Sequence, residues 1–168
     1  MKSASSVVMN SIIPNLQQFQ LEELGKTPMV DNPNAEISFK VDLEPSRVTK
    51  RILVGIRDES CNRGITVAVY PATGEVCDLS NGGGVIGYLS QSPVSPGSPI
   101  ACDLTLYRFG ANFVCSVRIQ GEIFLYPAFS LEGNTRLTAF VGQEGESEDQ
   151  RLSWSRLRLD VLEQPAAA

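Results

Sequence analysis

The sequence predicts an all-β fold, a two-sheet antiparallel β-sandwich preceded by a short N-terminal arm or helix. Three observations predict it. The 168 residues, 42% of them hydrophobic, suffice for one globular domain with its own core. From Ile37 onward, apolar and polar residues alternate with period two or gather in short β-rich runs. Turn residues separate these runs about every dozen positions, which is typical of sandwiches.

The first half of the expected sandwich contains four strands. Ile37 to Leu43 alternates apolar and polar positions, as a half-buried strand does. Arg51 to Arg57 and Ile65 to Tyr70 are β-rich runs bounded by turn residues. A short strand is expected from Glu75 to Leu79. The glycines and prolines between residues 80 and 99 then predict a long surface connection.

A hairpin with Gly110-Ala111 at its tip is supported by the pairing that it implies. Antiparallel alignment of Ile100–Phe109 with Asn112–Gln120 gives apolar pairs on one face, namely Cys102 with Ile119, Leu104 with Val117 and Leu106 with Cys115. On the other face it pairs Asp103 with Arg118, Thr105 with Ser116 and Tyr107 with Val114. A slip of one residue would lose both agreements, so the register is predicted together with the strands.

The chain is expected to turn back directly after this hairpin. A two-residue turn with glycine at its first position, Gly121-Glu122, would have type II′ geometry and lead into a third antiparallel strand. Two further strands are expected at Arg136 to Val141 and at Leu152 to Leu162. In the last strand the apolar phase shifts between Trp154 and Leu157, which indicates a bulge.

The first 35 residues depart from the strand pattern. Pro14 as a first-turn residue and Gly25 as a stop predict a short helix over about residues 14–24. An extended arm with Phe19 and Leu21 packed on the sandwich explains the same residues equally well. We therefore divide the chain into an arm of residues 1–35, a sandwich domain of residues 36–163 and a tail of residues 164–168.

Composition argues against several classes of function. The chain has no His, which removes most catalytic triads and most transition-metal sites. Its net charge of −5 disfavours nucleic acid as a partner. No signal peptide or membrane span is recognisable, so we expect a cytoplasmic protein. The four cysteines, Cys61, Cys77, Cys102 and Cys115, are expected to be buried reduced thiols, and no cofactor is expected.

The run from Ala111 to Glu122, followed by Pro127-Ala128-Phe129, resembles the late meander of the concanavalin A-like jelly rolls. This superfamily holds lectins, glucanases, laminin-G-like modules and SPRY domains. Its members turn at the glycine of an F-x-V-x-V-x-G-x strand, and SPRY members follow with an A-F pair. The resemblance implies a jelly-roll sandwich. The acidic E-x-D-x-x-E constellation of the glucanases is absent, which argues against a glycosidase.

The acidic residues offer no clear catalytic pair or metal site. A glycosidase needs two acids about 5 to 9 Å apart across a cleft, whereas Glu22-Glu23, Asp58-Glu59 and residues 144–149 lie beside turns. Asp58, Glu59 and Asn62, or Asp78 with Asn81, could supply oxygens to calcium, but a solvated turn is the simpler interpretation. Gly82-Gly83-Gly84 lacks the Lys-Ser or Lys-Thr of a phosphate loop.

Four side chains can be interpreted either as functional or as structural residues. Trp154 and Tyr88 could stack on a sugar ring, although a Trp in a terminal strand more often fills the space between sheets. Arg156 and Arg158 alternate with leucines, which places both on one outer face near the acidic residues 144–149. They are either an intramolecular charge match or a docking patch.

These observations favour a non-catalytic β-sandwich subunit that makes protein–protein contacts in a larger assembly. Residues 1–13 are more apolar than a free tail should be, and such segments usually dock. The expected contact residues are Val8, Ile12, Ile13, Phe19, Arg156 and Arg158. One alternative is a lectin-like carbohydrate-binding module. A second alternative is a hydrolase that uses carboxylates alone.

Overall fold

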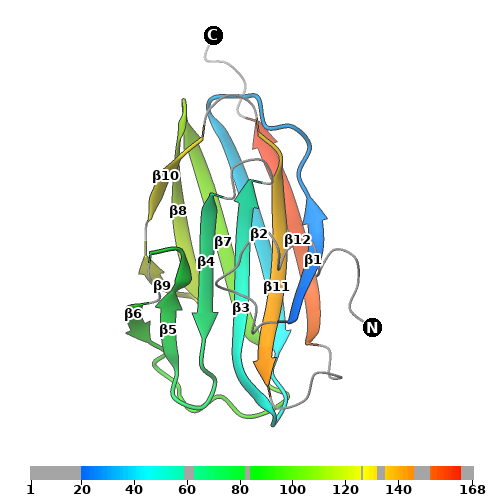
Figure 1. The fold of residues 1–168 in the computed structure, drawn as a ribbon, viewed down its shortest axis with the longest axis vertical. Coiled ribbons are helices and arrows are strands. Elements are labelled where there is room, and N and C mark those ends of the chain that lie inside the picture. The colour runs from blue at the N-terminus through cyan, green and yellow to red at the C-terminus, as the bar shows by residue number, and fades with distance from the viewer. Residues whose placement is uncertain are drawn as a thin grey trace.

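The computed structural model describes residues 20–58, 63–81, 84–125, 127–131, 135–145 and 152–163. These residues form two antiparallel sheets packed face to face (Figure 1), which confirms the predicted all-β sandwich. Sheet A has the strand order β1-β11-β3-β4-β5-β6. Sheet B has the order β10-β8-β7-β2-β12, with β9 paired to β8. No helix of the described ranges is long and apolar enough to cross a membrane.

The strand bounds follow the expected ranges closely, with β1, β6 and β10 in addition. Sheet A contains β1 (Gln20–Lys26), β3 (Thr49–Asp58), β4 (Gly64–Val69), β5 (Glu75–Asp78), β6 (Gly84–Tyr88) and β11 (Leu137–Gly145). Sheet B contains β2 (Ala35–Glu44), β7 (Ile100–Phe109), β8 (Asn112–Ile119), β9 (Glu122–Leu125), β10 (Ala128–Ser130) and β12 (Ser153–Glu163). A short 3-10 helix, η2 (Leu79–Asn81), follows β5.

The core lies between the two sheets and is built by period-two alternation. In β2 every second side chain from Ala35 to Leu43 is buried, and the intervening ones are half-buried or exposed. Phe39 and Phe113 are fully buried in this core. Burying a side chain of this kind contributes about 1.5 to 3 kcal/mol to stability. The alternation therefore fixes which face of each sheet B strand is left for solvent or ligand.

The predicted hairpin and its register are confirmed. Gly110-Ala111 joins β7 to β8, and all six expected cross-strand pairs occur, from Cys102 with Ile119 to Tyr107 with Val114. Gly110 has a φ of 64°, a conformation that glycine adopts without a Cβ penalty. The bulge expected in the last strand is also present, between Ser155 and Arg158 of β12.

The turn from β8 to β9 differs in type from the prediction. Ile119 pairs with Glu122, so the two central residues are Gln120 and Gly121, with φ values of 55° and 77°. Two positive φ values define a type I′ turn, with glycine second rather than first. Gln120 tolerates its position because its side chain accepts a hydrogen bond from Ala101 N at 3.0 Å and donates one to Pro99 O at 3.2 Å.

The N-terminal helix is wrong for residues 20–24, which belong to β1. This strand pairs with β11, and Leu21 is buried against Gly142 of that strand. Strand pairing satisfies the backbone groups, and Leu21 gains the burial that a helix would otherwise provide. The extended-arm alternative therefore holds from residue 20 onward. Val8, Ile12, Ile13 and Phe19 lie outside the described residues.

The connection between β5 and β7 contains an edge strand that the sequence did not predict. Gly84–Tyr88 forms β6 and pairs with β5. The rest of the connection follows the ends of other strands, since Leu89 N donates to Gly74 O and Val94 N donates to Pro71 O, both at 2.8 Å. Sequence inspection missed β6 because glycine and proline, which disfavour strands, dominate the composition of this connection.

Candidate functional site

The outward side chains of sheet B include a group of polar and charged residues on adjacent strands. They come from the central strands β2, β7 and β8, at positions that alternate with the core residues. We call this array the polar face, and it consists of Ser38, Lys40, Asp103, Thr105, Tyr107, Ser116 and Arg118. Several outward residues of sheet A, by contrast, are buried.

Asp103 lies between Lys40 and Arg118 in the polar face and is held by its neighbours. Lys40 Nζ lies 3.8 Å from Asp103 Oδ2, and Thr105 Oγ1 donates a hydrogen bond to Asp103 Oδ1 at 2.8 Å. The side chains of Lys40 and Asp103 are 51% and 28% exposed, so the pair remains in contact with solvent. A carboxylate oriented in this way still has acceptor capacity for a ligand hydroxyl.

Arg118 lies opposite Asp103 in the pairing of β8 with β7. Its side chain is exposed, and its guanidinium makes no hydrogen bond or ion pair with another residue of the described ranges. A guanidinium has five N–H donors in a planar fork, suited to paired oxygens. Arg118 is therefore the strongest unused donor group on this face.

Ser116 lies beside Arg118 and pairs with Thr105. Its residue is only 4% exposed, and its Oγ has no hydrogen-bond partner within the described structure. Buried hydroxyls are rarely unpartnered, because removing one from water without compensation costs about 1 to 3 kcal/mol. The orphan hydroxyl lies directly beneath the polar face.

Two aromatic rings border the polar face at the tip of the hairpin. Tyr107 is 39% exposed and pairs with Glu36 and Val114, and Phe109 is 61% exposed at the end of β7. An exposed ring offers a flat apolar platform, and a tyrosine adds a hydroxyl. The face thus combines charged hydrogen-bonding groups with aromatic surface.

The aromatic residues singled out from sequence do not form one site. Trp154 is 39% exposed in the edge strand β12, and its pairing with a core residue places it on the inner side of sheet B without full cover. It pairs with the buried Leu43, but an edge strand has no neighbour on its far side to cover the ring. Tyr88 is 61% exposed on β6, at the opposite edge of the sandwich (Figure 1).

Arg156 and Arg158 have acidic neighbours within sheet B. Arg156 Nε lies 3.8 Å from Asp42 Oδ2, and a nitrogen of Arg158 lies 3.3 Å from Asp160 Oδ2. The bulge in β12 breaks the alternation that would have placed both arginines together. The expected match with the acidic residues after 143 is not made by Glu144, which lies in sheet A. Residues 146–149 are outside the described ranges.

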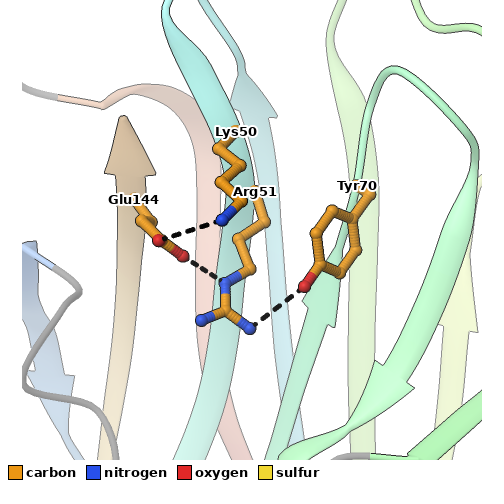
Figure 2. Close-up of polar contacts among 4 residues, drawn as sticks. All are labelled: Lys50, Arg51, Tyr70 and Glu144. Carbon is orange, nitrogen blue, oxygen red and sulfur yellow. Dashed lines mark hydrogen bonds and ion pairs between the residues drawn. The ribbon is translucent and has the colours of Figure 1, made fainter. Parts of the chain in front are cut away.

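Glu144 instead joins a polar cluster on sheet A that sequence inspection missed. Its Oε2 accepts a hydrogen bond from Arg51 Nε at 2.5 Å, and its Oε1 lies 3.5 Å from Lys50 Nζ (Figure 2). Arg51 also donates to the Tyr70 hydroxyl at 3.3 Å, with its Cζ 5.7 Å from the centre of that ring. Because Arg51 and Glu144 satisfy each other, the cluster stabilises the sheet rather than offering free groups.

The cysteines and loop carboxylates offer little reactive chemistry. Cys77, Cys102 and Cys115 are unpaired and buried, and burial raises the pKa of Cys115 to about 12. Such thiols stay protonated and are poor nucleophiles. Asp58 accepts a hydrogen bond from Thr135, and Asp78 accepts one from Ser80 N at 3.0 Å. The described residues contain no cluster of three metal-ligating side chains, and Glu59 and Asn62 fall outside them.

Sequence comparisons give no relative, whereas structural comparisons give many. No protein-family model matches the chain, and no curated protein matches it significantly. The metal-free carbohydrate recognition domain of Emp46p shares 9% identity over 90% of each chain, with a TM-score of 0.51. The carbohydrate-binding module CBM66 of Bacillus subtilis shares 10% identity over 83% of this chain and 94% of that one, with a TM-score of 0.45.

An enzyme also appears among the structural matches. The alginate lyase from Klebsiella pneumoniae shares 10% identity over 78% of this chain, with a TM-score of 0.46. The match covers 60% of the lyase, so a large part of that enzyme has no counterpart here. At such identities the comparisons establish the fold alone. The chain has the concanavalin A-like jelly-roll fold that its late meander resembles.

Proposed function

We propose that this protein is a non-catalytic, lectin-like carbohydrate-binding module and that the polar face of sheet B is its binding site. The observation that supports this most is the exposed Arg118 guanidinium, with its donors unused, opposite the fixed carboxylate of Asp103. The Emp46p domain, which has the same fold, is a carbohydrate recognition domain.

The chemistry of the polar face fits a sugar. A sugar hydroxyl both donates and accepts, so it is best bound between a carboxylate and a cationic donor. Asp103 and Arg118 provide this combination from adjacent strands. The half-exposed ring of Tyr107 adds a surface against which the C–H groups of a pyranose can pack.

This proposal takes the second interpretation of the sequence in place of the assembly subunit. Two of the residues expected to contact a partner, Arg156 and Arg158, have internal acidic neighbours in Asp42 and Asp160. The other four lie in residues 1–19. The polar face, by contrast, carries the Arg118 guanidinium and the unpartnered Ser116 hydroxyl side by side.

A glycan array followed by calorimetry on the best ligand tests the proposal. Arg118→Ala should weaken binding about 10- to 100-fold, because a hydrogen bond to a charged group contributes about 1.5 to 3 kcal/mol. Lys50→Ala is the matched control, since Lys50 is a cation with a 63% exposed side chain on the other sheet, and it should leave affinity unchanged.

Two outcomes would count against the proposal. The first is a folded full-length chain that binds no glycan. The second is glycan binding that Arg118→Ala and Tyr107→Ala both leave intact. Co-purification of a stoichiometric protein partner, without glycan binding, would favour the assembly subunit.

A further inference from the structure

A row of four charged side chains crosses the outer face of sheet B, from the edge strand β12 to β8. Arg158 of β12 pairs with Lys40 of β2. Lys40 also pairs with Asp103 of β7, which in turn pairs with Arg118 of β8. We call these four residues the charged row. It contains three cations and one acid, although the whole chain has a net charge of −5.

The charged row belongs to the solvent side of the sheet. Leu159, which follows Arg158, pairs with the buried Phe39 and packs against the core between the sheets. Since successive side chains of a strand point to opposite faces, Arg158 and Lys40 point outward. Arg158 thus extends the polar face by one strand beyond Lys40, to the edge of sheet B.

Two members of the charged row repel each other. Arg158 and Lys40 lie directly opposite in the pairing of β12 with β2. Like charges at such positions destabilise a sheet. Both side chains are exposed, so no packing requirement of the fold explains two cations there. An anion bound between them would remove the repulsion.

The acids near these cations leave them accessible. Asp103 contacts Lys40 at 3.8 Å, and Asp160 contacts Arg158 at 3.3 Å. In each pair the cation is the more exposed side chain, at 51% against 28% and at 71% against 48%. Exposed ion pairs contribute little to stability. Each cation can therefore turn to a ligand at little cost.

The bulge beside the charged row adds a fourth cation. The Arg156 side chain is 85% exposed, whereas that of its acidic neighbour Asp42 is 19% exposed. Asp42 and Asp160 occupy the outward positions on either side of the row. The row and these two flanking rows together contain four cations and three acids among the described residues. An approaching ligand thus meets cationic groups before it meets carboxylates.

We propose that the ligand of this site is an anionic oligosaccharide that lies across the strands, with its acidic groups along the charged row. The inference rests on the proposed carbohydrate-binding function and adds the charge and direction of the ligand. It also adds Arg158 as a contact. From β12 to β8 the row spans three strand spacings, about 14 Å, which is longer than one sugar ring. The guanidinium groups at its two ends suit the paired oxygens of carboxylate or sulfate groups.

Three tetrasaccharides with the same backbone test the charge of the ligand: a galacturonic acid tetramer, a sulfated galactose tetramer and the neutral galactose tetramer. In calorimetry on the full chain, one or both acidic tetramers should bind at least about tenfold more tightly than the neutral one. Added salt should reduce this difference. The two acidic tetramers distinguish a carboxylate from a sulfate as the preferred group. The corresponding dimers should bind less tightly, because they are too short to reach from Arg158 to Arg118.

Asp160→Asn gives a result that misfolding cannot produce. It removes the acid beside Arg158, so affinity for the preferred acidic tetramer should rise about two- to fivefold. Glu75→Gln on β5 is the matched control, since it removes one negative charge from sheet A, and it should leave the affinity unchanged. Arg158→Gln should weaken binding of the acidic tetramer about tenfold without affecting neutral glycans.

The outcomes separate this inference from the function on which it rests. Binding of neutral glycans on the array, with no preference for the acidic tetramers, would overturn the inference and leave carbohydrate binding standing. Unchanged affinity in both Asp160→Asn and Arg158→Gln would also overturn it. So would equal affinity for a thymidine oligonucleotide of the same charge, since the face would then recognise charge without sugar. A chain that binds no glycan at all would overturn both proposals.

Discussion

Arg156 adopts a backbone conformation that costs stability. Its φ of 53° lies in the left-handed region, which L-residues disfavour by roughly 1 to 2 kcal/mol. A glycine there would remove this cost, at the expense of about 0.5 to 1 kcal/mol of added chain entropy in the unfolded state. The contact with Asp42 adds little, because the Arg156 side chain is 85% exposed. We expect Arg156→Gly to raise the free energy of unfolding by about 0.5 kcal/mol in urea denaturation.

Arg158 provides the comparison for that measurement. It pairs with Lys40 after the bulge and is also largely exposed, but it is not among the residues with positive φ. Arg158→Gly should therefore lower stability by about 0.5 to 1 kcal/mol. Destabilisation of the same size by both glycines would show that the bulge stores no strain at residue 156.

The polar face shows how far single residues could be predicted from sequence. Period-two alternation and charge pairing place Asp103 opposite Arg118 and Thr105 opposite Ser116, as the structure confirms. The contact of Lys40 with Asp103 was not predictable, because it depends on β2 lying beside β7. Similarly, Gln120 has a positive φ that local preference opposes, and its compensating hydrogen bonds reach back to Pro99 and Ala101.

At the scale of elements, the polar cluster of Figure 2 connects three strands of sheet A. Arg51 of β3 is held by Glu144 of β11 and by Tyr70, which follows β4. The Arg51 side chain is only 11% exposed. Glu144→Gln would remove a carboxylate counter-ion from the Arg51 guanidinium, and we expect a loss of about 1 to 3 kcal/mol in the free energy of unfolding.

Lys50 separates the effect of that partly buried pair from general surface charge. Its amino group also contacts Glu144, but its side chain is 63% exposed. Lys50→Ala should change stability by less than about 1 kcal/mol, as is usual for exposed ion pairs. Equal losses from Glu144→Gln and Lys50→Ala in thermal unfolding would mean that burial of Arg51 does not set the cost.

The connection after β6 is joined to β9 by a contact that depends on pH. Glu122 accepts hydrogen bonds from the Ser90 hydroxyl and from Ser90 N at 3.0 Å, and these lower the pKa of Glu122 from its ordinary value of 4.5. A lowered carboxyl pKa means that the contact is complete above 4.5 and is lost as the pH falls through the folded-state pKa.

Nuclear magnetic resonance can follow the loss of the contact between Glu122 and Ser90 as the pH falls. The Ser90 amide proton should shift with a midpoint below pH 4.5, and Glu122→Gln should abolish that step. Ser90→Ala should raise the midpoint recorded at Glu122, because the substitution removes the hydroxyl hydrogen bond that lowers the pKa of Glu122. A midpoint at or above 4.5 in the unmodified chain would contradict the assignment.

Sequence patterns predicted elements well where burial on one side sets a period, and poorly elsewhere. The strands β2, β7 and β8 each have one face on the core, so alternation marks them clearly. In β1 the buried Leu21 faces outward from sheet A, so its period gives no core signal and a helix seemed equally compatible. The edge strand β6 pairs on one side only and has exposed ends, which leaves little pattern to detect.

In the whole molecule, the outer faces of the two sheets differ in their exposure to solvent. On the outer face of sheet A, Leu53, Ala68 and Cys77 are buried although they lie outside the core cluster between the sheets. The polar face of sheet B stays in contact with solvent through Lys40, Tyr107 and Arg118. Substitutions on the first surface should therefore change stability, and substitutions on the second should change ligand affinity.

The topology also predicts an order of folding. β7 and β8 are joined by a two-residue turn, whereas β2 pairs with β12 from the far end of the chain. Closing the short loop costs far less entropy, so the hairpin should form first. Leu104→Ala in β7 should therefore slow folding, with a φ-value well above that of Leu159→Ala in β12. Stopped-flow chevrons monitored by the single Trp154 would measure both, and a higher φ-value at Leu159 would show that the long-range pairing forms first.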